Sequence, residues 1–269
     1  MPIVKLPGGE NIWFRKLGTG KPVLQIHGSA FGHRNFEKMT PLMERHFEVI
    51  DFDLPGYGDS TGSIGSGGME GIAKQVYELI RAMGYDKLSV HGTSFGAMVG
   101  LTLAAKHPEV VDRLILSCFM ARYDNAARMM RSTWKRAARE SGMEAVADLT
   151  SVAGFARSFY ERPGAQDQLA AMRAAFSKNT PAAMIAGTET VERTDLTPLV
   201  PLVRAPTLMI AGAEDNMTPF EPPASGIGMA QIAKMLPVGK TVVLPNCGHY
   251  LVIEQPEKAT ELILEFMNG

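Results

Sequence analysis

Short, dense apolar runs separated by longer amphipathic stretches dominate the hydrophobic pattern of this chain. Six runs lack the polar alternation of a half-buried strand, which is typical of strands buried on both faces. They lie at 23–26, 49–52, 88–90, 113–116, 207–210 and 241–244. Helical periodicity fills the intervals, at 36–46, 69–83, 95–106, 224–236 and 257–267. This alternation of strand and helix predicts a mostly parallel sheet that is covered on both faces.

Two other segments stand outside this alternation. Near the start, extended segments at 3–6 and 12–17 flank Pro7-Gly8-Gly9, which predicts a β-hairpin. The glycine-rich stretch from Gly62 to Gly68 is too short for a linker, and we expect a surface loop there.

The longest departure runs from 121 to 199, where no convincing strand occurs. Helical windows lie there at 126–139, 166–176 and 181–191. The segment follows one predicted strand and precedes another, so it rises from the carboxyl edge of the sheet, where α/β folds bind ligands. We therefore expect a core domain formed by 1–120 and 200–269, with a helical cap (lid) subdomain over 121–199.

Composition and charge exclude several function classes without changing this fold prediction. The 269 residues are 45% hydrophobic and 20% charged, and 27 basic against 28 acidic side chains leave a net charge of −1. That balance gives no strong field for nucleic acid or an anionic membrane, so neither is an expected partner. With no run of 18 apolar residues and no secretory pattern at the start, we expect a cytoplasmic protein. Cys118 and Cys247 lack a C-x-x-C spacing and are expected to be reduced thiols.

The most specific chemical signal is a G-x-S-x-G motif at Gly92-Thr93-Ser94-Phe95-Gly96, which joins a predicted strand to a predicted helix. The two glycines let the chain turn sharply, so that Ser94 Oγ projects from the tip of the sheet. The helix that starts there also directs the positive end of its dipole at the serine. We therefore predict that Ser94 is a nucleophile.

A serine nucleophile needs a general base and an acid that orients the base. His249 directly follows the last predicted strand, and Asp215 lies on the loop after the strand before it. Glu214 is the neighbouring alternative to Asp215, and Asp124 is a weaker rival. The predicted triad is thus Ser94, Asp215 and His249.

Acyl transfer also requires two hydrogen-bond donors for the developing oxyanion. One is the N–H of the residue after the nucleophile, here Phe95. The second is expected from the loop after the strand at 23–26, where Gly28 lets the backbone turn inward and present the N–H of Ser29. His27 is expected to support this loop rather than to catalyse.

Together these motifs resemble the α/β-hydrolases, in particular their capped esterases and lactonases. The resemblance covers almost the whole chain and is carried by His27-Gly28, Asp53-Leu54-Pro55-Gly56-Tyr57-Gly58-Asp59-Ser60, the elbow at Ser94, the loop from Gly212 to Pro219, and Gly248-His249. It implies an eight-stranded sheet with strand 2 antiparallel, flanked by helices, and a helical cap inserted after strand 6. Serine at position 94 disfavours dehalogenases and epoxide hydrolases, which usually have aspartate there.

The resemblance implies a serine hydrolase that cleaves a small carboxylic ester or lactone through an acyl-enzyme. No zinc, Walker A or dinucleotide motif is present, so neither a metal nor a cofactor is expected, and the partner is a small-molecule substrate. One alternative is carbon–carbon hydrolysis of meta-cleavage products, although many such enzymes carry tryptophan where this chain has Tyr250. Amide hydrolysis, perhydrolysis and a slow-turnover receptor on the same fold also stay open, as does the oligomeric state, with a homodimer among the options.

Candidate substrate contacts come from both parts of the chain. From the core we expect Gly28 and Tyr250, and from the 121–199 segment Trp134. That segment also holds a basic stretch, at Arg122, Arg128, Arg131, Lys135, Arg136 and Arg139. A solvated helix face is one interpretation of the stretch. The sharper hypothesis is that Arg128 and Arg131 guide a substrate that bears a carboxylate.

Overall fold

Eight strands form one sheet in the computed structural model, which describes residues 2–64 and 67–269. Their bounds are β1 Ile3–Lys5, β2 Asn11–Leu17, β3 Pro22–Ile26, β4 Glu48–Phe52, β5 Leu88–Thr93, β6 Val111–Ser117, β7 Thr207–Gly212 and β8 Gly239–Leu244. The order across the sheet is β1-β2-β4-β3-β5-β6-β7-β8. β2 is antiparallel to β1 and to β4, and the remaining neighbours are parallel. The predicted sheet, its hairpin and its antiparallel strand 2 are confirmed.

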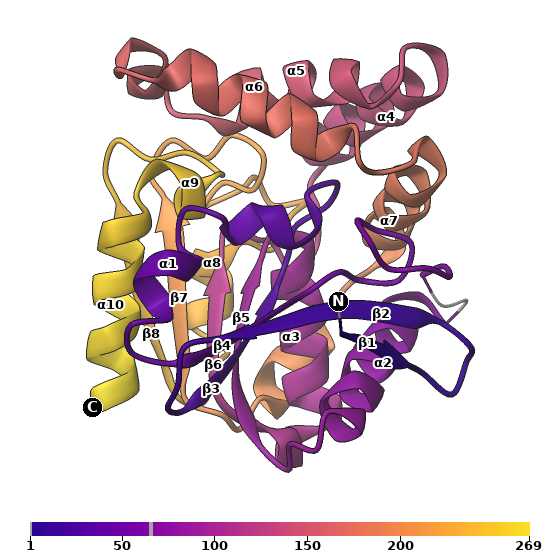
Figure 1. Ribbon diagram of the computed structural model, residues 1–269. Helices are drawn as coiled ribbons and strands as arrows, with labels where there is room; N and C mark the ends of the chain where they lie inside the picture. The colour runs from indigo at the N-terminus through magenta and orange to yellow at the C-terminus, as the bar shows by residue number, and fades with distance from the viewer. Residues whose placement is uncertain (1, 65–66) are drawn as a thin grey trace.

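The sheet is covered by helices on both faces (Figure 1). α2 Gly68–Ala82, α3 Phe95–Lys106 and α8 Met229–Ala233 pack against one face in the larger apolar core. α1 Thr40–Met43, α9 Leu251–Glu254 and α10 Pro256–Asn268 contribute to a second core on the other face. All six residues of β5 are buried between these layers, as expected for a central parallel strand.

The edge strand β8 corrects one expectation. The apolar run at 241–244 predicted a strand buried on both faces, but β8 pairs only with β7 and most of its residues are half-buried or exposed. Val243 is 39% exposed. An apolar run therefore indicated a strand correctly without indicating its place in the sheet.

Two predicted helices are shorter than their periodicity suggested. The window 36–46 contains a 3₁₀ helix that ends at Phe36 and then the single turn α1, because Pro41 lacks an N–H and cannot continue a helix from the preceding turn. The window 224–236 reduces to α8, whose start is set by Gly226 and Gly228. The Gly62 to Gly68 stretch was predicted as a surface loop, and its residues 65 and 66 lie outside the described residues.

Four α-helices lie between β6 and β7 and form a layer beside the carboxyl edge of the sheet (Figure 1). They are α4 Asn125–Glu140, α5 Met143–Gly154, α6 Ala165–Phe176 and α7 Pro181–Arg193, with 3₁₀ helices at Arg157–Glu161 and Thr197–Leu202. The sequence pattern missed α5. Arg122 pairs with both Asp195 and Ile227, so the chain enters and leaves this layer side by side. We call residues 121–199 the helical insert and retain 1–120 with 200–269 as the proposed core domain.

The insert has an apolar core of its own, which also takes in Phe31, Met217 and Tyr250 from the loops at the carboxyl edge of the sheet. The insert is therefore packed onto the sheet rather than held away from it. Among the described residues, no helix has both the length and the apolar character needed to cross a membrane.

Candidate active site

Ser94 occupies a sharp turn between β5 and α3. Its backbone has φ 54° and ψ −116°, a conformation that is strained for a residue with a side chain. Two residues later, a Cβ atom on Gly96 would lie 2.0 Å from the carbonyl oxygen of Ile26, so only glycine lets α3 approach β3 this closely. The strained turn and the close approach together place Ser94 Oγ at the carboxyl edge of the sheet.

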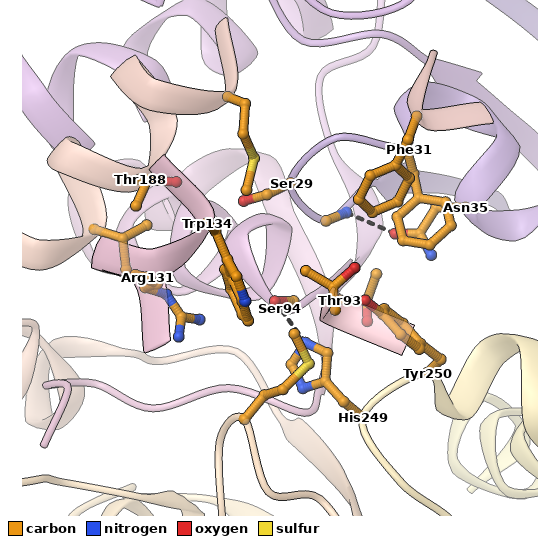
Figure 2. Close-up of a pocket in the computed structure, with 16 residues that line it drawn as sticks. Ser29, Phe31, Asn35, Thr93, Ser94, Arg131, Trp134, Thr188, His249 and Tyr250 are labelled. Atoms are coloured by element: carbon orange, nitrogen blue, oxygen red, sulfur yellow. Dashed lines mark hydrogen bonds between the residues drawn. The ribbon is translucent and has the colours of Figure 1, made fainter. Parts of the chain in front are cut away.

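Ser94, His249 and Asp215 form a continuous hydrogen-bonded chain. Ser94 Oγ lies 2.9 Å from His249 Nε2, and His249 Nδ1 lies 2.9 Å from Asp215 Oδ2 (Figure 2 shows the serine–histidine contact). His249 and Asp215 are buried, whereas Ser94 is partly exposed to the pocket. Side chains from three loops that are far apart in sequence therefore meet with the spacing that nucleophilic catalysis requires.

The Asp215 carboxylate is held by the turn that follows it. The backbone N–H groups of Met217 and Thr218 donate to Oδ1 at 2.9 and 2.8 Å, and the Thr218 hydroxyl donates to Oδ2 at 2.6 Å. Burial raises the pKa of Asp215, but the His249 charge and the hydrogen bonds outweigh it, so the pKa lies below its ordinary value. An ionised Asp215 can only accept hydrogen bonds, so Nδ1 of His249 carries the hydrogen and Nε2 is free to accept from Ser94.

Neither rival acid approaches His249 in this way. The Asp124 carboxylate accepts the N–H of Ala127 at 2.7 Å and caps the start of α4. Glu214 Oε2 accepts the N–H of Arg157 at 3.2 Å. Of the three acids weighed from the sequence, Asp215 is the one that the structure brings to the histidine.

The loop that carries His249 is fastened to the helical insert. The N–H of His249 donates to the carbonyl of Gly154 at 2.6 Å, at the end of α5. The carboxylate of Glu254 bridges the two parts, since it accepts the N–H of Gly248 at 2.9 Å and that of Ala156 at 3.1 Å. Burial raises the pKa of Glu254 to about 7. The position of the histidine therefore depends on the insert as well as on β8.

The two predicted oxyanion donors come from the start of α3, which follows Ser94, and from the loop after β3. Phe95 is the first residue of α3, so its N–H has no partner within the helix. On the facing loop, the N–H of Gly28 donates to Asn35 Oδ1 at 2.7 Å, and a Cβ on Gly28 would lie 3.4 Å from Ser94 Cβ. The loop carrying Ser29 is thus held close to Ser94. The roles of Ser29 and Phe95 as oxyanion donors stay a prediction.

His27 supports this loop, as expected from the sequence. Its Nε2 accepts the N–H of Leu54 at 2.9 Å, which leaves Nδ1 to donate to the carbonyl of Gly28 at 2.8 Å. Burial lowers the pKa of His27, so the neutral ring that these two contacts require is favoured.

A pocket between the sheet edge and the insert exposes Ser94 and His249 (Figure 2). It measures about 560 Å³, including the part of its mouth that is open to solvent. Seven of the predicted site residues line it, namely Gly28, Ser29, Ser94, Arg131, Trp134, His249 and Tyr250. Phe95 and Asp215 are buried behind it, as a backbone donor and an orienting acid would be.

Arg128 does not line this pocket. It is exposed on α4, where it donates to the backbone carbonyls of Tyr123 and Glu192. The two arginines that the sequence grouped together are therefore separated by the fold.

Residues 21–256 match the family described as the α/β hydrolase fold. The chain belongs to this family. Its relatives in sequence include the 2-hydroxy-6-oxo-6-(2'-aminophenyl)hexa-2,4-dienoic acid hydrolase of Metapseudomonas resinovorans, 24% identical over 97% of this chain and 89% of that protein. The enol-lactonase from Burkholderia xenovorans LB400 has a similar structure, with a TM-score of 0.88, 22% identity and complete coverage of both chains. So does a thermophilic esterase from Thermogutta terrifontis, with a TM-score of 0.86, 28% identity and coverage of 100% of this chain and 98% of that one.

Within this α/β-hydrolase, several pocket residues carried no sequence signal. Asn35, Thr150 and Thr188 bring polar side chains to the pocket, and Phe31, Phe176, Val191 and Met217 bring apolar ones. For Thr218, beside the predicted triad, the available signal was Asp215, because an aspartate side chain often accepts the backbone N–H two residues on and so marks a turn. The others lie in elements whose packing the sequence does not specify.

Among the described residues, one cluster has the composition of a metal site: His33, Asp53 and Asp59. The Asp53 carboxylate already accepts the backbone N–H groups of His33 and Asp59, and His33 Nδ1 lies 3.0 Å from it. These contacts account for the cluster as the hydrogen-bonded core of a turn. The expectation that no metal or cofactor takes part stays a prediction.

Proposed function

We propose that this α/β-hydrolase is a serine hydrolase that cleaves a small carboxylic ester or lactone through an acyl-enzyme intermediate. The observation that carries the proposal is the chain of two 2.9 Å contacts from Ser94 Oγ through His249 to Asp215, placed at the wall of a pocket. The roles of the remaining residues follow from this arrangement.

In the acylation step, His249 Nε2 takes the proton of Ser94 as Oγ attacks the substrate carbonyl carbon. The carbonyl oxygen becomes an oxyanion, which accepts hydrogen bonds from the N–H groups of Phe95 and Ser29. The imidazolium formed on His249 is stabilised by Asp215, which stays ionised. The tetrahedral intermediate then collapses, the C–O bond to the alkoxide breaks, and Nε2 returns the proton to that oxygen.

In the deacylation step, water replaces the alcohol and the same groups act again. His249 removes a proton from the water, which attacks the acyl carbon, and the bond to Ser94 Oγ breaks as Nε2 reprotonates it. With a lactone, the alkoxide that leaves in the first step stays attached to the acyl chain, so the product is a hydroxy acid.

The names of similar proteins favour two scissile bonds. An enol-lactonase and an esterase support cleavage of a C–O bond. The dienoic acid hydrolase of Metapseudomonas resinovorans supports carbon–carbon hydrolysis as the second candidate. Tyr250, which lines the pocket directly after the catalytic histidine, is compatible with either substrate.

The test is a kinetic comparison of substrates that separates these reactions. Purified protein is assayed on short-chain 4-nitrophenyl esters, simple lactones and a coloured ring-fission dienoate. Ser94→Ala is the nucleophile variant, and Ser132→Ala, at an exposed position of α4, is the matched control. We expect Ser94→Ala to lower kcat by several orders of magnitude, on the order of 10⁴ or more, with the fold retained.

Each outcome decides one part of the proposal. Preference for esters or lactones supports the leading function, and rapid serine-dependent loss of the dienoate colour moves the assignment to carbon–carbon hydrolysis. Turnover that is equal in Ser94→Ala and Ser132→Ala would refute the serine mechanism. Absence of turnover on every substrate would favour the receptor alternative.

A further inference from the structure

Arg131 is a buried guanidinium that lines the catalytic pocket. It lies on α4, is 5% exposed, and stacks 3.8 Å from the ring of Tyr123 and 5.0 Å from that of Trp134. Its Nη2 donates to the Tyr123 hydroxyl, and its Nη1 makes a long contact of 3.5 Å to the carbonyl of Ala127. Figure 2 shows its side chain extending toward Trp134 and the side of the pocket that holds Ser94.

No carboxylate neutralises this charge. Within residues 2–64 and 67–269, no Asp or Glu oxygen lies within 4.0 Å of the Arg131 guanidinium. Several other basic side chains of the insert do have an acidic partner, as Lys135 has Glu192 at 2.6 Å. Arginine has five N–H donors, and the two contacts above use two of them. Arg131 also lines the pocket, so it has both a charge without an acidic partner and unused hydrogen-bond donors at the place where a substrate anion would bind.

The surroundings favour a single negative charge on a planar group. A buried charge is costly without a partner, and one guanidinium neutralises one carboxylate in a two-pronged geometry. A phosphate monoester would bring a second negative charge at neutral pH, whereas Arg131 is the one arginine or lysine among the described residues that line the pocket. Carboxylate is therefore the anion that this site fits.

We propose that Arg131 binds a free carboxylate of the substrate, so that the natural ester or lactone is an acid whose carboxylate is separated by a short chain from the scissile carbonyl. This inference rests on the proposed function, because it takes Ser94 as the point of attack. It assigns the other end of the substrate to the insert. Arg131 is then a specificity residue that acts by binding, and it contributes little to the chemical step.

The experiment compares matched substrates that differ in this one charge. Monomethyl esters of dicarboxylic acids with four to seven carbons are assayed beside methyl esters of the monocarboxylic acids of the same chain length, with methanol release as the signal. We expect the best acidic ester to exceed its neutral counterpart in kcat/KM by roughly 10- to 100-fold, the range of a charge-assisted pair. Arg131→Gln and Arg131→Met should lower kcat/KM for the acidic esters far more than for the neutral ones, so that the preference disappears.

Two further variants keep the test sharp. Arg136→Gln removes a charge from the exposed face of the same helix and should leave kcat/KM for both substrates unchanged. Tyr123→Phe removes the hydroxyl that holds the guanidinium and should weaken the preference by a smaller factor than Arg131→Gln. Circular dichroism and thermal unfolding show that each variant is folded.

A binding measurement separates failure of this inference from failure of the proposed function. Calorimetry with Ser94→Ala protein should detect monomethyl glutarate and not methyl pentanoate, and the signal should vanish in Ser94→Ala/Arg131→Gln. This result does not depend on turnover. The inference is overturned if Arg131→Gln lowers kcat/KM equally for acidic and neutral esters. It is also overturned if monomethyl glutarate binds equally tightly to Ser94→Ala and to Ser94→Ala/Arg131→Gln. If Ser94→Ala turns over esters like the unmodified protein, the proposed function fails while the binding result stands.

Discussion

Glu254 allows a quantitative test of how the insert holds the histidine loop. Its carboxylate is 7% exposed and accepts the N–H groups of Gly248 and Ala156. Burial raises its pKa from 4.5 to about 7, although both N–H groups and Arg162 oppose the shift. The perturbation is Glu254→Gln, which preserves the shape of the side chain and removes its titration.

The sign and size follow from proton linkage. The folded protein binds this proton more tightly than the unfolded chain, so the contribution of Glu254 to stability is greatest below pH 4.5 and declines as pH rises through about 7. Each pKa unit corresponds to about 1.4 kcal/mol. Between pH 5 and pH 8, the unmodified protein should therefore lose about 2.5 kcal/mol of unfolding free energy that Glu254→Gln does not lose.

The assay is urea unfolding of both proteins at pH 5, 6, 7 and 8, followed by circular dichroism. Glu221→Gln, at an exposed position, is the matched control, and its unfolding free energy should change with pH as that of the unmodified protein does. Parallel curves for the unmodified protein and Glu254→Gln would show that the carboxyl titrates near its ordinary pKa. The reasoning from its burial would then be refuted.

Three other predictions concern the triad and its supports. Asp215→Asn should lower kcat on the order of 10⁴-fold with KM little changed. Asp124→Asn should retain kcat, since asparagine also caps a helix, and equal losses of kcat in the two variants would contradict the assignment of the acid. Gly96→Ala should lower the unfolding free energy by more than about 2 kcal/mol, because its Cβ would lie 2.0 Å from the Ile26 carbonyl oxygen. An unchanged urea midpoint would contradict this prediction. Asn35→Ala should lower kcat roughly tenfold by freeing the N–H of Gly28, a loss that a change confined to KM would argue against.

The chemical motifs could be identified from the sequence because each depends on residues that are close together in the chain. Gly96 and the strand-to-helix change around Ser94 specify a sharp turn at one position. The ends of parallel strands share one edge of a sheet, so residues that follow successive strands, such as Asp215 and His249, were expected together and do lie together. The eight-stranded sheet with its antiparallel strand 2 and the helical insert after β6 followed from the resemblance and are confirmed by the family match and the structure.

Local patterns did not specify which elements become buried by others. The run at 241–244 had the composition of a central strand, yet β8 lies at the edge. α5 lacked a clear signal, and Gly154 at its end turned out to support the N–H of His249. The edge position of β8 and the contact of Gly154 with His249 both depend on tertiary packing, which local patterns do not specify.

Arg128 and Arg131 show most clearly what a local sequence pattern cannot specify. The sequence by itself determined a basic helix and the grouping of Ser94, Asp215 and His249 as a candidate triad. Arg128 and Arg131 lie three residues apart on α4 and carry the same charge, so composition and periodicity treat them alike. Only the tertiary structure exposed the first and enclosed the second between Tyr123 and Trp134 beside the pocket. Burial depends on contacts between segments distant in the chain, and those contacts form only when the fold is complete.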